Sequence, residues 1–197
     1  MKKNIYFASD FHLGAPSYAE SRKREDRIVA WLNFIEPNAS ELFLMGDVFD
    51  FWFEYKKVIP KGFVRLQGKL AEMADAGIKI YFFKGNHDMW VDDYFTQEIG
   101  IEIISDELKI ERNGKKFYLH HGDGLGPGDG QYKFLRKIFR NPLCQWLFAI
   151  LPPRIGMGIA NGWSGSSRIA SHKKEVFLGD ENEWLAIYAK EQLQKEH

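Results

Sequence analysis

Four short polar clusters hold the residues of this sequence that are best suited to chemistry. They are Asp10-Phe11-His12, Gly46-Asp47, Gly85-Asn86-His87-Asp88 and His120-His121-Gly122-Asp123. Each cluster follows directly on a short apolar run with the composition of a β-strand. In α/β proteins with an open sheet, ligands bind outside the carboxyl ends of the strands. We therefore expect the four clusters to converge on one site.

The clusters have the composition of a catalytic metal site. Asp10 and His12 are two residues apart, so on an extended chain their side chains point the same way and can chelate one ion. Glycines precede Asp47 and Asn86 and permit tight turns that bring both side chains to the same point. Carboxylate, amide oxygen and imidazole without thiolate suit Mn²⁺, Fe²⁺, Zn²⁺ or Mg²⁺ in an open site.

Asp47 is the candidate bridge between two such ions. Two ions roughly 3.5–4 Å apart can clamp a phosphate and activate a water, which is chemistry for hydrolysis of a phosphoester or phosphoanhydride. His87 follows Asn86, so its imidazole is expected to face the substrate, as a proton donor to the leaving oxygen or as a stabiliser of phosphoryl charge. Asp88 is expected to orient that imidazole. The sequence thus predicts His87 and Asp88 as catalytic residues.

The pattern of apolar residues predicts an α/β fold with an antiparallel addition. Strands are expected at residues 4–9, 41–45, 78–84, 101–104, 107–112 and 116–121. Apolar residues at helical spacing predict helices at 22–34 and 64–76, which alternate with the first three strands. Arg112-Asn113-Gly114 is typical of a hairpin turn.

The composition of the chain changes after residue 130. Two aromatic, basic segments with helical periodicity end at Pro152-Pro153, and a glycine-rich stretch follows at 156–165. We predict a core at 1–130, a helical cap or insertion at 131–180 and a return helix of the core at 181–197. The cap can cover acyl chains, lie on a bilayer interface, or form an ordinary helical hairpin packed on the core.

Composition and charge narrow the possible partners. Of the 197 residues, 45% are hydrophobic and 27% charged, which is ordinary for a globular protein. Lys+Arg and Asp+Glu each number 27, so a formal net charge of zero disfavours general nucleic-acid binding. Cys144 is the one cysteine and indicates a reducing compartment. No apolar run reaches the ~18 residues of a membrane span, and the apolar run after Lys2-Lys3 is too short for a signal peptide. We expect a cytoplasmic protein, soluble or peripheral to the inner membrane.

Taken in order, the clusters resemble the motifs of the calcineurin-like metallophosphoesterase superfamily: D-x-H, G-D, G-N-H-D/E and H. The resemblance covers residues 4–123. It implies a four-layer αββα sandwich with a dinuclear centre, in which Asp10 and His12 bind one metal, Asp47 bridges, and Asn86 and His121 bind the other. It further implies two divalent ions, with Mn²⁺ expected.

The superfamily's G-H-x-H motif does not occur in the sequence. The fold is therefore expected to be truncated at the C-terminus, with the rest of the core missing. For the same reason these 197 residues are expected to hold metal weakly and to turn over poorly.

Two further segments are similar to the UDP-2,3-diacylglucosamine pyrophosphohydrolases of lipid A synthesis, which release UMP and 2,3-diacylglucosamine 1-phosphate. Residues 121–132 resemble their H-G-D-x-L…D-x-x-Y stretch, and residues 167–174 resemble their S-R-x2-N-x2-K segment. The substrate residues expected on this basis are Asn86, His87, Asp129, Ser167, Arg168, Ser171 and Lys174. Ser171 stands where that family has Asn, and His87 stands where many members have Arg. Arg168, Lys173 and Lys174 supply charge for a diphosphate or a membrane surface.

Several functions remain open at this stage. The leading interpretation is a peripheral hydrolase acting on a glycolipid-nucleotide substrate at the cytoplasmic face of a membrane. A general metallophosphodiesterase acting on another nucleotide-linked substrate is the main alternative. A protein phosphatase is disfavoured because residues 46–52 read G-D-V-F-D-F-W in place of that family's G-D-x-V-D-R-G. A catalytically incomplete scaffold that binds a partner or lipid through the cap is the non-enzyme hypothesis. The oligomeric state is not predicted.

Overall fold

The structure is a computed structural model that describes residues 4–125, 130–159, 162, 179 and 181–195. The chain forms two compact units, Met1–Glu107 and Leu108–His197, which are described separately. The boundaries predicted for the core, the cap and the return helix remain predictions.

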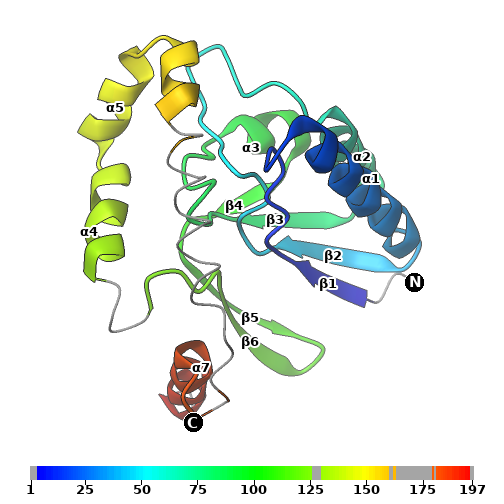
Figure 1. The fold of residues 1–197 in the computed structure, drawn as a ribbon. Coiled ribbons are helices and arrows are strands. Elements are labelled where there is room, and N and C mark those ends of the chain that lie inside the picture. The colour runs from blue at the N-terminus through cyan, green and yellow to red at the C-terminus, as the bar shows by residue number, and fades with distance from the viewer. Residues whose placement is uncertain (1–3, 126–129, 160–161, 163–178, 180, 196–197) are drawn as a thin grey trace. The chain divides into compact units, whose positions relative to one another are not determined.

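The first unit is built on a parallel sheet of four strands in the order β1-β2-β3-β4 (Figure 1). The strands are β1 (Asn4–Ala8), β2 (Ala39–Leu44), β3 (Lys79–Phe83) and β4 (Glu102–Ile104). The helices α1 (Tyr18–Ile35), α2 (Val64–Asp75) and α3 (Tyr94–Ile99) connect them in turn. The prediction of an α/β fold is confirmed, as are these strands and the first two helices to within a few residues.

Two helices of the first unit differ from expectation. The helix α1 begins four residues before the predicted start, because Ser17 is its N-cap and accepts a hydrogen bond from the Glu20 amide at 3.3 Å. Its first turn has no buried apolar side chain, so apolar periodicity did not reveal it. The helix α3 was not predicted; it has six residues, of which only Phe95 is buried, and that is too short for a periodic signal.

Both faces of the central strands are buried, which explains their continuous apolar runs. On one face Leu42, Leu44, Ile80 and Phe82 join the core with Leu32 and Ile35 of α1 and Leu66, Leu70 and Met73 of α2. On the other face the Phe43 ring stacks on Tyr81, with centroids 4.4 Å apart, and on Phe7 at 5.0 Å. Burial on both faces fixes the register of the sheet, and with it the points where its strands end.

Two glutamates from neighbouring segments satisfy the first amides of α2 and α3. Neither helix has a side-chain cap of its own. Oε1 of Glu25, on α1, accepts hydrogen bonds from the amides of Arg65 and Leu66, both at 3.0 Å. The carboxylate of Glu54 accepts from the amides of residues 92–94 at 2.9–3.0 Å. Each carboxylate also suits the positive end of the helix dipole, so these contacts fix the starts of both helices.

The described part of the second unit contains a hairpin and several helices. The strands β5 (Glu107–Arg112) and β6 (Lys115–His120) pair across a turn in which Asn113 and Gly114 have φ values of 53° and 71°. Positive φ at both positions is what a type I′ turn requires, so the predicted Asn-Gly hairpin is confirmed. The helices are α4 (Gly130–Phe139), α5 (Pro142–Ile150) and α7 (Trp184–Lys195). Residues 153–159 are also helical.

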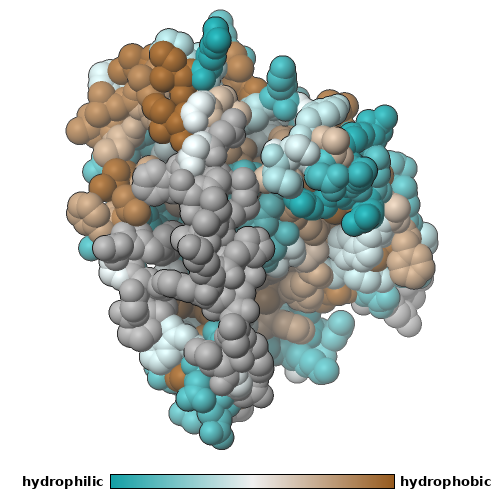
Figure 2. Space-filling view, in the orientation of Figure 1, coloured by the Kyte–Doolittle hydropathy of each residue, from teal (hydrophilic) through white to brown (hydrophobic). Residues whose placement is uncertain are grey.

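The helical part of the second unit exposes large apolar side chains. Figure 2 shows them gathered over α5 and the helical residues 153–159. Leu143, Trp146, Leu147, Ile150, Ile155 and Ile159 are each more than half exposed. Within the described part of the chain, no helix is both long enough and apolar enough to cross a membrane.

Candidate metal centre

The loops that follow β1 and β2 are joined by backbone hydrogen bonds beyond the carboxyl ends of both strands. The amides of residues 10, 12 and 13 donate, in that order, to the carbonyl oxygens of residues 46, 47 and 48, over 3.1, 2.9 and 3.0 Å. The pairing continues as an isolated parallel bridge between Leu13 and Phe49. Parallel strands that end side by side thus bring the Asp10-x-His12 loop against Asp47, as the clusters predicted.

The backbone of this region is strained at the predicted ligands. Asp10, His12 and Asp47 have φ values of 59°, 44° and 52°. Among the described residues other than glycine, only Phe63 and Asn113 share a positive φ. Left-handed backbone is unfavourable for side chains of this size and persists only where the surroundings hold it in place. Such strain is typical of functional sites, and here it lies on three of the five predicted metal ligands.

The Asp88 carboxylate ties the loop after β2 to the loop after β3. It is fully buried, and it accepts four backbone hydrogen bonds of 2.8–3.2 Å, from the amides of residues 47–49 and of Gly85. A carboxylate has about four acceptor positions, and these amides match that number. This positioning role was not foreseen from the sequence. The expected contact of Asp88 with the His87 ring remains a prediction.

Close approach of these two loops requires the glycine at position 85. A Cβ atom there would lie 2.1 Å from Oδ1 of Asp47 and 2.5 Å from its backbone nitrogen. The same Oδ1 accepts a hydrogen bond from the His87 amide at 2.9 Å. Asp47 is 3% exposed, so its carboxylate is enclosed between the loops and its orientation is fixed.

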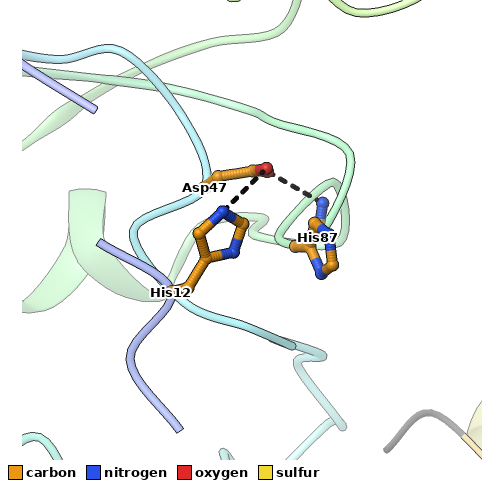
Figure 3. A group of neighbouring side chains, drawn as sticks. All are labelled: His12, Asp47 and His87. Carbon is orange, nitrogen blue, oxygen red and sulfur yellow. Dashed lines mark hydrogen bonds and ion pairs between the residues drawn. The ribbon is translucent and has the colours of Figure 1, made fainter. Parts of the chain in front are cut away.

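Three side chains from the three loops face one another in Figure 3: His12, Asp47 and His87. One candidate ligand atom from each lies within 4.8 Å of the other two. Nε2 of His12 is 3.8 Å from Oδ2 of Asp47 and 3.8 Å from Oδ1 of Asp10. These distances are too long for hydrogen bonds. They suit atoms that share an ion about 2.1 Å from each of them.

The protonation of His12 also suits a metal ligand. Burial is the largest influence and lowers the pKa of His12. The Asp47 carboxylate opposes this effect, while a charged His87 adds to it. A neutral imidazole keeps a lone pair for a metal ion, so the donor set fits a divalent cation of the kind predicted.

Asp50 is a site residue that the sequence analysis missed. It is 6% exposed, and its Oδ1 lies 3.9 Å from Nδ1 of His12 and 3.8 Å from Nδ1 of His87. Its backbone oxygen is 3.0 Å from Nδ1 of His87. Nδ1 of His12 is buried and makes no hydrogen bond to any described residue. The signal available in the sequence was an acid three residues after Asp47 in an otherwise apolar loop.

The remaining predicted site residues fall into two groups. Asn86 lies in the first unit, half-buried beside His87, whereas His121 directly follows β6 in the second unit. Asn86 and His121 remain predicted metal ligands. Five predicted substrate residues lie outside the described residues: Asp129, Ser167, Arg168, Ser171 and Lys174.

Comparison with known proteins gives consistent matches along the chain. The profile of the family "Calcineurin-like phosphoesterase" matches residues 3–186. A UDP-2,3-diacylglucosamine hydrolase of Porphyromonas gingivalis is 41% identical, over 97% of this chain and 78% of that protein. Proteins of the same name from Edwardsiella ictaluri and Histophilus somni are 32% and 29% identical, over 90% and 91% of this chain and 66% and 75% of their own lengths.

Proposed function

Because the chain belongs to the calcineurin-like phosphoesterase family, a family of metal-dependent hydrolases, we propose that it cleaves UDP-2,3-diacylglucosamine to UMP and 2,3-diacylglucosamine 1-phosphate in lipid A synthesis. The observation that carries this proposal is the meeting of His12, Asp47 and His87 beyond the parallel sheet. Similarity to the named hydrolases over nearly the whole chain supports the choice of substrate.

We propose that the site holds two divalent ions, with Mn²⁺ preferred. Asp10, His12 and Asp47 would hold the first ion, and Asp47, Asn86 and His121 the second. When bound, such ions polarise phosphoryl oxygens and lower the pKa of a bound water. The oxygen and nitrogen donor atoms support this assignment. The hydrogen-bonded loops that position the donors of the first unit support it as well.

His87 is proposed to donate a proton to the leaving phosphate oxygen. A backbone oxygen only accepts hydrogen bonds, so the contact with the Asp50 carbonyl places a proton on Nδ1. A second proton, on Nε2, forms the imidazolium that can act as donor. The carboxylates of Asp47 and Asp50 lie close enough to stabilise that charge.

The experiment that tests the substrate compares the products from three substrates. The full-length protein with Mn²⁺ is incubated with UDP-2,3-diacylglucosamine, with UDP-N-acetylglucosamine and with bis(p-nitrophenyl) phosphate. We expect UMP and the acylated sugar phosphate from the first substrate and little turnover of the others. Release of UDP, or equal turnover of all three, would replace this proposal with a general phosphodiesterase.

We also propose that the protein acts at the cytoplasmic face of the inner membrane, bound peripherally through its second unit. The apolar side chains of α5 are exposed, and so are Lys133 and Lys137 of α4 and Arg140, the residue that follows it. Apolar side chains beside basic ones are typical of surfaces that bind anionic lipid. Because the proposed substrate is itself a lipid, we also propose that the five predicted substrate residues outside the described part of the chain contact it. They are Asp129, Ser167, Arg168, Ser171 and Lys174.

Sedimentation with lipid vesicles tests the membrane proposal. Binding to phosphatidylglycerol-containing vesicles is expected to fall at least about fivefold when Trp146 and Ile150 are both replaced by Ser. The control is Phe34→Ser, which removes a 79%-exposed aromatic residue from α1 in the other unit. Equal vesicle binding by both variants would show that α5 does not contact the membrane.

A further inference from the structure

Arg24 of α1 is hydrogen bonded to the loop that carries two of the proposed metal ligands. Its Nη1 atom donates to the carbonyl oxygens of Phe11, His12 and Ala15 at 3.1, 2.9 and 3.2 Å. The residue is half-buried. Hydrogen bonds from a charged donor are roughly twice as strong as neutral ones, so this single nitrogen is a major anchor for the loop.

A second side chain of α1 acts on the same loop. The hydroxyl oxygen of Ser21, which is 5% exposed, accepts a hydrogen bond from the Gly14 amide at 2.8 Å. Ser21 and Arg24 are three residues apart and therefore lie on one face of the helix. The start of α1 thus presents an acceptor and a cationic donor to the loop.

The backbone groups of residues 11–15 bond mainly to the loop after β2 on one side and to α1 on the other, and the Ala15 amide also donates to the His12 carbonyl at 3.4 Å. On the sheet side, the amides of residues 12 and 13 donate to the loop after β2, and the carbonyl of Leu13 accepts from the Asp50 amide at 2.9 Å. The three carbonyls bound by Arg24 are not used in that pairing. Arg24 therefore completes the hydrogen bonding of a loop whose one face is already fixed by the sheet.

We infer that Arg24 is a positioning residue of the metal centre, which holds the left-handed turn at Asp10 and His12 in the geometry that binds metal. Three carbonyls of one short loop reach one nitrogen only when the loop is curled as it is here. Without the cation these carbonyls lose their shared partner, and the strained φ angles at Asp10 and His12 are free to relax. This inference rests on the proposed metal site.

Hydrogen exchange on the metal-free protein tests the inference without any catalytic readout. In Arg24→Met, amide exchange at residues 12–15 is expected to rise at least about tenfold, whereas the amides of β2 and β3 remain protected. The matched control is Arg27→Met, because Arg27 is an exposed arginine of the same helix with no described hydrogen bond. Arg24→Lys keeps a cation with three donors and is expected to restore part of the protection.

Mn²⁺ titration supplies the second readout. Arg24→Met is expected to weaken Mn²⁺ binding about 10- to 100-fold relative to Arg27→Met, and in the assay of UMP release to lower kcat with little change in KM. A lower melting temperature with loop exchange and Mn²⁺ affinity within twofold of the control would overturn the inference. If Arg24→Met does not fold, Arg24→Lys takes its place. Its loop exchange and Mn²⁺ affinity are then compared with those of Arg27→Met by the same criteria. If the unsubstituted protein binds no Mn²⁺, the proposed function fails, while the exchange experiment still tests the anchor.

Discussion

Oδ1 of Asp47 lies 2.1 Å from the point where a Cβ atom on Gly85 would sit. The carboxylate proposed to bridge two metals therefore has room only because the facing loop has no side chain at this position. That loop also provides the His87 amide, which holds the same oxygen. The positions of Gly85, of the Asp47 carboxylate and of His87, the proposed proton donor, thus depend on one another sterically.

Gly85→Ala is expected to lower Mn²⁺-dependent hydrolysis by about 10²-fold, because the two loops must separate by more than 1 Å to admit a methyl group. The matched control is Gly68→Ala, on the exposed side of α2, where a Cβ atom meets nothing within 4 Å. That variant should keep full activity and gain up to about 1 kcal/mol of stability from helix propensity. Full activity in Gly85→Ala would show that the loops are not packed as described.

Asp88→Asn is expected to reduce the free energy of unfolding by about 3 kcal/mol, measured by urea denaturation. The substitution removes a charge that accepts four backbone hydrogen bonds and turns an amide donor toward groups that are donors themselves. Asp75→Asn, at the exposed end of α2, is the control and should stay within about 0.5 kcal/mol of the unsubstituted protein. A loss of activity without a loss of stability would instead favour a direct catalytic role for Asp88.

Glu25→Gln is expected to destabilise the protein by about 1–2 kcal/mol, because the buried carboxylate caps α2 from outside that helix. It also pairs with Arg22 at 2.7 Å, so the substitution leaves that guanidinium with Asp26 as its ion-pair partner. Urea denaturation measures the change, and Glu98→Gln on the exposed surface of α3 is the control. Equal stability of the two variants would mean that α2 does not depend on this contact.

The ion pair of Lys69 predicts a loss of stability at high pH. Burial acts to lower the pKa of Lys69, but hydrogen bonds to Glu36 at 2.7 Å and Glu72 at 3.1 Å outweigh it and raise the pKa. A raised folded-state pKa gives stability that is fully present below the ordinary lysine value of about 10.4 and is lost as pH rises through the folded value. The stability difference between the unsubstituted protein and Lys69→Met should therefore be largest near neutral pH. A difference that grows above about pH 11 would reverse the sign of this contribution.

The sequence predicted the sheet and the meeting of Asp10, His12 and Asp47 because both depend on local patterns. Apolar runs that stop at polar clusters marked β1, β2 and β3, and the order of a parallel sheet then placed Asp10, His12 and Asp47 together. The left-handed backbone at these residues gave no sequence signal, because glycine, which usually marks it, is absent from those positions.

The contacts that hold the site were not predicted because their partners are distant in sequence. Asp88 bonds to amides about forty positions away, and Arg24 bonds to a loop nine to thirteen positions earlier. Charged residues on a helix such as α1 are ordinarily solvated, so pattern alone does not distinguish Arg24 from Arg27. Only the fold decides which of them meets a carbonyl.

The most direct test of the central claim is UMP release from UDP-2,3-diacylglucosamine as a function of Mn²⁺, measured for the full-length protein and for Asp47→Asn. We expect no release after EDTA treatment, recovery on addition of Mn²⁺, and a loss of more than about 10²-fold in Asp47→Asn with its fold intact by circular dichroism. Asp75→Asn should match the unsubstituted protein. UMP release that persists without metal, or that survives the loss of the Asp47 carboxylate, would contradict a metal centre built on His12 and Asp47.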